Sequence, residues 1–301
     1  MNETRQPARV PHSVLVVFGS VLIAWSGIFV RLANLPPATS ATLRCAYAVP
    51  PLAALAWWWV RTGRAERLTR AQWRWAIVAG VSFGADLVLW HVSIGAVGAG
   101  LATVLGNSQV FLYPLGAWLV WKERPTRRQL AVLPALLLGI VLISGALGAD
   151  SFGEDPLLGA ITGLLTGVAY AGFLLAMRGG SPEHGTPIAS LCVATVVAGA
   201  VSFACALVAG SFELFPAWPA IGWMLALAWV CQVIAWLMIS GSLAHVAAAR
   251  VSILLLVQPV TALGLGVVVL EEAPSPAQLC GAALVLIGVV FGSRGAAATA
   301  D

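Results

Sequence analysis

Residues 121–130 read WKERPTRRQL, and residues 270–279 read LEEAPSPAQL. The two stretches lie 149 positions apart, share the pattern Glu-x-Pro-x-x-x-Gln-Leu, and each follow a long apolar run. Further identities continue at the same offset, with Gly139, Val141 and Ser144 matching Gly288, Val290 and Ser293. Chance identities are common in apolar sequence, but a shared polar pattern is not. We infer that the chain consists of two related halves.

The composition indicates a membrane protein. Of the 301 residues, 60% are apolar and only 9% are charged, whereas a soluble domain carries about a quarter charged residues. The net charge of +4 does not indicate nucleic-acid binding, because the basic residues lie in short segments between apolar runs and form no continuous stripe. We therefore expect the surface to face the lipid bilayer, and we expect no nucleic acid as a partner.

Apolar segments long enough to cross a bilayer, which takes about 20 residues, recur along almost the whole chain. Most of them end at proline, glycine or charged residues. Two expected hairpins, at Ser93 to Gly100 and Ser240 to Val246, contain no proline or charge cluster. The stretch from Arg74 to Trp121 is too long for one crossing and must turn near Ser93 to Gly100. The predicted fold is an all-α membrane protein with ten transmembrane helices at 14–33, 38–60, 74–95, 99–121, 128–147, 157–177, 187–209, 220–240, 247–270 and 277–293.

The basic residues indicate the orientation of these helices, because short cytoplasmic loops of membrane proteins are enriched in Lys and Arg. With the N-terminus in the cytoplasm, fourteen of the 16 basic residues fall on the cytoplasmic side. The outer loops then hold Asp150, Glu154, Asp155, Glu213, Glu271 and Glu272. We therefore expect both termini in the cytoplasm and a location in the plasma or inner membrane.

Each half has an odd number of predicted spans, so the two halves must run in opposite directions through the membrane. The expected organisation is two inverted five-helix repeats, the usual plan of a secondary transporter, with a solute site where the halves meet. The expected parts are a cytoplasmic tail at 1–13, the first repeat at 14–147, an outer linker at 148–156, the second repeat at 157–293 and a cytoplasmic tail at 294–301.

Several motifs of the chain occur together in one known family. They are Trp25-Ser26-Gly27 in the first span, Arg44 in the second, Pro259 in the ninth, and the loop units 121–125 and 270–274. With these residues the chain resembles the EamA-type permeases of the drug/metabolite transporter superfamily, from Val14 to Ser293. The resemblance implies a ten-helix bundle with a central cavity, which exports or exchanges metabolites such as amino acids, or toxic compounds. The first half has Val110 in the register of Pro259, and the seventh span has no counterpart of Arg44, so strict symmetry is not implied.

Ionisable side chains inside the predicted spans are the first candidates for function, because placing one in the hydrocarbon region costs at least ~2.5 kcal/mol. Asp86 is the only acidic residue inside a predicted span, and Arg44 lies at a similar depth in the neighbouring span. A pair between the two is feasible, and its role is either a structural clamp between helices or a gating or proton-coupling site. His91 is a second candidate for proton coupling, with a hydrogen-bonded contact between helices as the alternative.

Polar and aromatic residues within the spans are candidates for a solute cavity. They are Trp25, Trp90, Asn107, Gln109, Tyr113, Tyr170, Gln232, Trp236 and Gln258. Gln109 and Gln258 occupy equivalent positions in the two halves, and Gln232 and Trp236 share one face of a helix. Aromatic walls favour flat, apolar or cationic solutes. Helix packing and interhelical hydrogen bonds are the alternative roles for each of these residues.

The expected function is secondary active transport of a small organic solute by alternating access, coupled to protons or to a counter-solute, in a monomer or homodimer. The chain contains no Walker loop, metal-ligand set or Ser/His/Asp arrangement. We therefore expect no cofactor, no metal and no enzymatic reaction. The alternatives are an intramembrane enzyme or lipid-handling protein, which needs a reactive constellation, and a passive channel, which needs a ring of like charges or a repeated filter segment.

Overall fold

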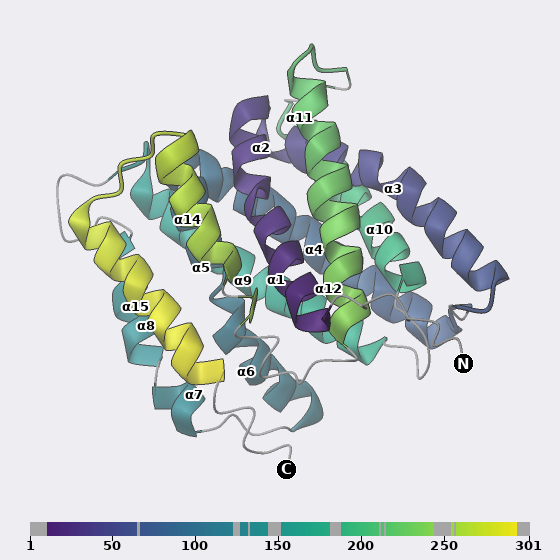
Figure 1. The fold of residues 1–301 in the computed structure, drawn as a ribbon, viewed down its shortest axis with the longest axis horizontal. Helices are drawn as coiled ribbons and strands as arrows, with labels where there is room; N and C mark the ends of the chain where they lie inside the picture. The colour runs from purple at the N-terminus through teal and green to yellow at the C-terminus, as the bar shows by residue number, and fades with distance from the viewer. Residues whose placement is uncertain are drawn as a thin grey trace, which may run out of the picture.

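The computed structural model contains helices as the only regular secondary structure in the residues that it describes. These residues are 11–64, 67–122, 127–131, 133–143, 152–180, 188–210, 212–213, 215–243, 254–255 and 257–293. The helices are α1 (His12–Ala24), α2 (Ser26–Ala33), α3 (Pro37–Arg61), α4 (Arg70–Val97), α5 (Ala99–Gly106), α6 (Gln109–Trp121), α7 (Arg127–Ala131), α8 (Leu133–Ile143), α9 (Pro156–Gly179), α10 (Ile188–Val208), α11 (Ala220–Ala226), the π-helix η1 (Leu227–Ile234), α12 (Ala235–Leu243), α14 (Val257–Val269) and α15 (Pro276–Ser293). Figure 1 shows these helices packed as one bundle. The predicted all-α fold is confirmed for this part of the chain.

Local sequence explains where several helices begin and end. The chain turns between α4 and α5 at Gly98, whose φ of +88° favours glycine, so the turn expected near Ser93 to Gly100 is confirmed. Helix α4 begins at Arg70 because Thr69 forms a capping box with Gln72. The other expected hairpin without a proline or charge cluster, at 240–246, extends into residues outside the described part.

Three of the predicted spans are interrupted along their length. Span 14–33 consists of α1 and α2, which meet at Trp25. Span 99–121 consists of α5 and α6, divided at Asn107 and Ser108. Span 220–240 contains η1 between α11 and α12. Interruptions of this kind leave backbone groups without regular helical partners, and they are common where a membrane protein forms a binding site.

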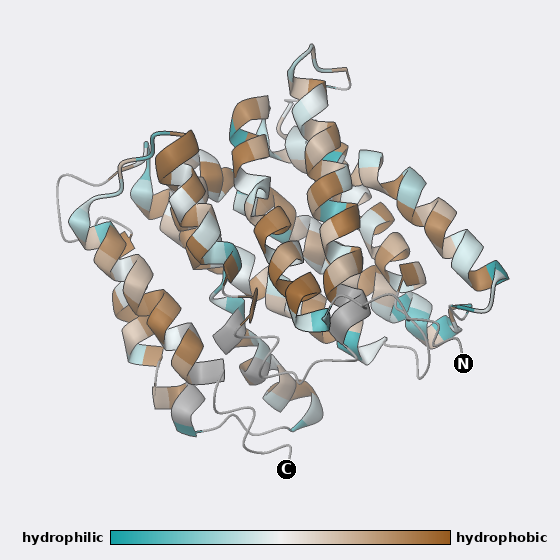
Figure 2. Ribbon diagram, viewed as in Figure 1, coloured by the Kyte–Doolittle hydropathy of each residue, from teal (hydrophilic) through white to brown (hydrophobic). Residues whose placement is uncertain are grey.

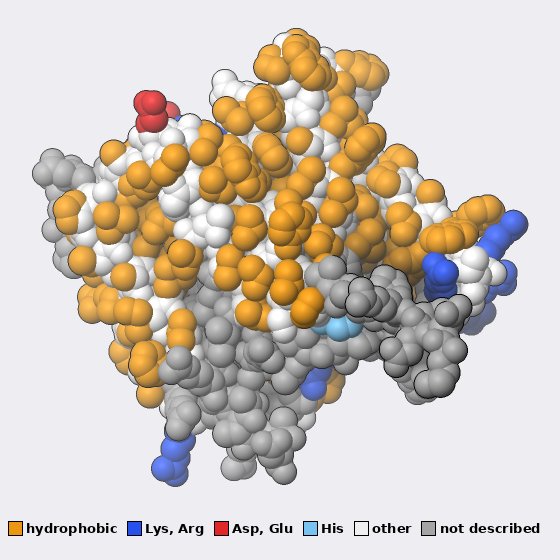
Figure 3. Space-filling view, viewed as in Figure 1, with side chains coloured by type: hydrophobic (Ala, Val, Ile, Leu, Met, Phe, Trp, Pro, Cys, Tyr) orange, Lys and Arg blue, Asp and Glu red, His pale blue; other side chains and the backbone are white. Residues whose placement is uncertain are grey.

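Five helical stretches of the described residues are long and apolar enough to cross a bilayer. They are His12–Ala33, Arg70–Val97, Pro156–Gly179, Ile188–Val208 and Ala220–Ile239. Three further apolar helices are shorter, namely Leu133–Ile143, Val257–Val269 and Pro276–Gly288. Hydrophobic residues predominate along the described helices in Figure 2, and apolar side chains cover most of the described surface in view in Figure 3, as expected for contact with lipid. Length and hydropathy thus single out five spans, fewer than the ten predicted.

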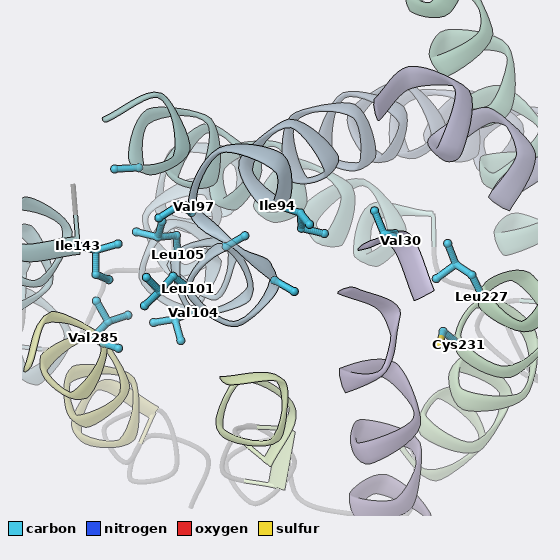
Figure 4. Close-up of a cluster of buried hydrophobic side chains, with 14 of the residues drawn as sticks. Val30, Ile94, Val97, Leu101, Val104, Leu105, Ile143, Leu227, Cys231 and Val285 are labelled. Carbon is cyan, nitrogen blue, oxygen red and sulfur yellow. The ribbon is translucent and has the colours of Figure 1, made fainter. Parts of the chain in front are cut away.

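The two halves of the chain share one hydrophobic core. Helix α4 packs against α9 and α10, α5 against α14, and α8 against α15. The largest buried cluster includes Ile94 of α4, Leu101 and Leu105 of α5, and Val285 of α15 (Figure 4). Helices from both halves therefore enclose the centre of the bundle.

Glu272 caps the N-terminal end of α5. Its side chain is only 4% exposed. Its Oε1 accepts a hydrogen bond from the backbone N–H of Ala99 at 2.6 Å, and its Oε2 accepts one from Gly100 at 3.2 Å. A carboxylate at this position satisfies N–H groups that have no helical partner, and it interacts favourably with the helix dipole. We expected Glu272 in an outer loop. It lies in the α14–α15 connection, but its charge is buried in this cap instead of facing solvent.

Gln278, the second polar residue of the repeated pattern, joins the same connection to the first half. Its Nε2 donates to the carbonyl oxygens of Ile143 at 3.2 Å and Phe152 at 3.0 Å. Its Oε1 accepts from the N–H groups of Phe152 at 2.9 Å and Ser275 at 3.0 Å. In the second half the repeated pattern therefore makes contacts between the halves. The side chains of the counterparts, Glu123 and Gln129, lie outside the described residues.

Two glycines of α14 provide a matched test of the Glu272 cap. A Cβ at Gly266 would overlap with Oε2 of Glu272 and lie 3.0 Å from its Cδ, whereas a Cβ at Gly264 would meet no atom within 4 Å. We expect Gly266→Ala to lower the melting temperature of the purified protein by several degrees, because the Glu272 carboxylate must move off α5. Gly264→Ala should leave it unchanged or raise it, because alanine favours a helix over glycine by up to ~1 kcal/mol. Equal melting temperatures for the two variants would contradict the cap.

Candidate functional site

A polar cavity lies inside the bundle, enclosed by helices of both halves. Its volume is about 70 Å³. Its charged residues are Arg44 of α3 and Asp86 of α4. The polar and aromatic part of the lining consists of Ser26, Trp90, Thr103, Asn107, Thr166, Tyr170, Trp236 and Gln258, and the remainder consists of Ile23, Phe83, Leu87 and Gly106. Segments far apart in the sequence thus place two ionisable groups together in an otherwise apolar interior.

Two neighbouring side chains hold the Arg44 guanidinium. Arg44 is 4% exposed, and its Nε donates a hydrogen bond to Oε1 of Gln232 in η1 at 3.0 Å. Its Cζ lies 5.9 Å from the centre of the Trp90 ring, within the range of a cation–π interaction. Among the described residues, the two terminal nitrogens of Arg44 have no hydrogen-bond partner. They remain available to a molecule in the cavity.

The expected pair between Asp86 and Arg44 is not formed. Both residues line the cavity, but no ion pair joins them in the described part of the chain. Gln232 accepts the hydrogen bond from the Nε of Arg44, and Trp90 lies beside the guanidinium. Asp86 is 8% exposed. Its carboxyl group is likewise left without a hydrogen bond from the described residues, so both charged groups stay free.

His91 lies close to the cavity but does not line it. Its Nδ1 lies 2.6 Å from the carbonyl oxygen of Leu87, to which it donates a hydrogen bond. Its ring meets Trp90 edge to face, with the ring centres 5.3 Å apart. Its Nε2 is buried without a partner. His91 is therefore held by a hydrogen bond within its own helix and by contact with Trp90.

The predicted cavity residues divide into two groups. Trp90, Asn107, Tyr170, Trp236 and Gln258 line the cavity. Trp25, Gln109, Tyr113 and Gln232 lie outside its described lining. Of these, Trp25 stacks on Phe29 at the break between α1 and α2, Gln109 begins α6 beyond the break that separates it from Asn107, and Gln232 lies behind Arg44. The expected amides of Gln109 and Gln258 are therefore not gathered in the cavity.

Three hydroxyl residues of the lining, which were not among the predicted cavity residues, are Ser26, Thr103 and Thr166. Thr103 donates to the carbonyl oxygen of Ala99, whereas the hydroxyl groups of Ser26 and Thr166 are buried without a partner. Serine and threonine in membrane helices commonly bond to their own backbone, so their presence alone carries little signal. Only the position of Ser26 beside Trp25 in a family motif pointed to this region.

A bundle of apolar helices is the architecture of a multi-pass membrane protein. The sequence profile of the EamA-like transporter family matches residues 12–145 and again 157–294. The chain therefore belongs to this family, which confirms the resemblance and the presence of two repeats. Family members are transporters of the drug/metabolite type, so the class is that of a membrane transporter.

A solved structure shares this fold. It is described only as "Crystal structure of protein", is 19% identical, covers 93% of this chain and 96% of its own chain, and superposes with a TM-score of 0.60. At this level of identity the likeness concerns the fold alone. No curated protein matches the sequence.

Proposed function

We propose that the protein is a secondary active transporter that exports or exchanges a small organic solute, amino-acid-like or drug-like, by alternating access through the central cavity. The observation that carries this proposal is the pair of buried ionisable groups, Arg44 and Asp86, that face one cavity without pairing. Burying ionisable groups in a membrane protein costs free energy, so their presence there supports a functional role. A solute with both a carboxylate and an ammonium group would satisfy both side chains at once.

The walls of the cavity support a solute with an apolar portion. Trp90, Tyr170 and Trp236 present aromatic surface, and Phe83 and Leu87 present apolar surface. Thr166 and Ser26 add hydroxyl groups, of which that of Thr166 is buried without a partner among the described residues. These residues would bind the body of the solute while the two charged groups bind its polar end.

The size of the cavity supports alternating access. A volume of about 70 Å³ holds only a few water molecules, so an organic solute requires the surrounding helices to move apart. Because helices of both repeats enclose the cavity, a movement of one repeat against the other would open it to one side at a time. Coupling to protons or to a counter-solute would supply the energy, and Asp86 is the residue we assign to that coupling.

We further propose that the chain crosses the plasma or inner membrane ten times, in two inverted repeats. Both termini then lie in the cytoplasm. The two matched segments of similar length support the repeats. In Figure 3 the Lys and Arg side chains gather at the lower and right margins, and the acidic ones at the upper left. That separation supports the orientation given by the loop charges. The oligomeric state we propose is a monomer or homodimer.

Counterflow in liposomes tests this function. Purified protein, reconstituted into liposomes loaded with a single unlabelled amino acid, should accumulate the same radiolabelled amino acid transiently and saturably. A panel of aliphatic, aromatic, acidic and basic amino acids, together with lipophilic cations, covers the proposed solute classes. Flux that rises linearly with concentration would indicate a channel, and chemical conversion of the solute would indicate an enzyme. Either result, or the absence of counterflow for every member of the panel, would overturn the proposal.

A further inference from the structure

The π-helix η1 carries a glutamine, Gln232, that contacts the guanidinium of Arg44. Gln232 is fully buried, and its Oε1 accepts the hydrogen bond from Nε of Arg44 at 3.0 Å. Its Nε2 has no partner and is buried. An unpartnered buried amide costs stability, so packing alone does not account for a glutamine at this position.

We propose that Gln232 is a positioning residue that keeps the Arg44 guanidinium away from Asp86, so that both charged groups remain free to bind the solute. This inference rests on the proposed function of the cavity. The geometry points to it because Arg44 and Asp86 face the same small cavity and yet form no ion pair. Two opposite charges in a medium of low dielectric attract each other strongly. Something must therefore hold them apart, and the bond to Gln232 is the only hydrogen bond of Arg44 in the described part of the chain.

The surroundings of Gln232 make it a rigid support. The indole N–H of Trp229 donates to the carbonyl oxygen of Tyr47 in α3 at 3.2 Å. Two residues further along, the thiol of Cys231 donates to the carbonyl oxygen of Leu22 in α1 at 3.1 Å. These contacts fasten η1 to α3 and α1, and Gln232 lies one residue after Cys231. A π-helical segment turns its side chains differently from an α-helix, and such segments occur frequently at functional sites.

The consequence for a solute is direct. With Gln232 in place, Arg44 lines the cavity and its terminal nitrogens have no partner among the described residues, so a carboxylate can bind them. Without Gln232, the guanidinium would turn to the Asp86 carboxyl group, and the resulting pair would neutralise both binding groups. Gln232 thereby keeps the charges of Arg44 and Asp86 separate in the cavity, while its own Nε2 stays without a hydrogen bond among the described residues.

The test measures the reactivity of Arg44 with phenylglyoxal, which attacks the terminal guanidinium nitrogens, by peptide mass spectrometry of the purified protein. Gln232→Met removes the acceptor and keeps an unbranched side chain of similar size. We expect Arg44 to react at least fivefold more slowly in this variant, because it pairs with Asp86. The melting temperature should be unchanged or higher, and counterflow of L-leucine should fall at least tenfold. Adding Asp86→Asn to Gln232→Met should restore the reactivity of Arg44, because its competing partner has gone.

Two further variants keep the result interpretable. Glu213→Gln changes an exposed carboxylate outside the cavity, and it should leave both Arg44 reactivity and counterflow as in the wild type. Gln232→Leu repeats the experiment if the methionine variant fails to fold. Unchanged Arg44 reactivity in the folded variant, or failure of Asp86→Asn to restore it, would overturn the positioning role. A wild type that carries no solute would overturn the proposed function instead, because Arg44 reactivity is measured without solute.

Discussion

Glu272→Ala is expected to lower the free energy of unfolding by about 3 kcal/mol or more, since hydrogen bonds to charged groups contribute roughly 1.5–3 kcal/mol each. Two such bonds disappear, and the N–H groups of Ala99 and Gly100 remain buried without a partner. The alanine side chain also leaves a void beside Gly98 and Gly266, which now lie against the carboxylate. Thermal unfolding of the purified protein in detergent measures the effect.

The adjacent residue supplies the control. Glu271 is exposed and carries the same charge one position earlier in the same loop. Glu271→Gln should leave the melting temperature close to that of the wild type, whereas Glu272→Gln should give a loss smaller than that of Glu272→Ala, because the amide oxygen still accepts one of the two bonds. A similar loss at both positions would show that loop charge, and not the cap on α5, stabilises the protein.

Asp86→Asn should abolish or uncouple transport, lowering counterflow by about 30-fold or more, since removal of a buried charged partner costs roughly 2 kcal/mol or more. The asparagine has nearly the same shape, but it lacks the charge that would bind an ammonium group or carry a proton. Because Asp86 forms no ion pair with Arg44 in the described structure, the melting temperature should not fall. The variant is therefore expected to insert and fold normally.

Counterflow and thermal unfolding, measured on the same preparation, separate the two interpretations of Asp86. Loss of transport without loss of stability supports a role in binding or coupling, whereas a lower melting temperature would support a structural clamp. Glu213→Gln serves as the control, because this carboxylate is exposed and lies outside the cavity. Full counterflow in Asp86→Asn would remove Asp86 from the mechanism.

Much of the fold could be predicted because membrane helices obey local rules. A span needs length and hydropathy, and both can be read directly from the chain, as they were for α9 and α10. The turn at Gly98 could be predicted from length alone. The interruptions at Trp25 and at Asn107 could not, because nothing in an apolar run marks where a helix will break against its neighbours.

The site could be predicted only in part, for a related reason. Asp86 and Arg44 stand out because a charge in a lipid environment is rare. Ser26 and Thr166 do not stand out, since small hydroxyl residues are common in such helices. The depth of Asp86 and Arg44 along two helices says nothing about a third helix, and it is Gln232 from η1 that accepts the hydrogen bond of Arg44.

The amino-acid sequence by itself determined the membrane character of the protein, the two repeats and the residues with the chemistry for a solute site. Each of these depends on composition, or on patterns within a few dozen residues. Only the tertiary structure decided that Glu272 caps a helix of the other half, at a separation of 173 residues, and that Gln232 holds Arg44 across 188 residues. A buried polar group takes whichever partner the packing of distant helices brings within hydrogen-bonding distance, and no local pattern specifies that partner.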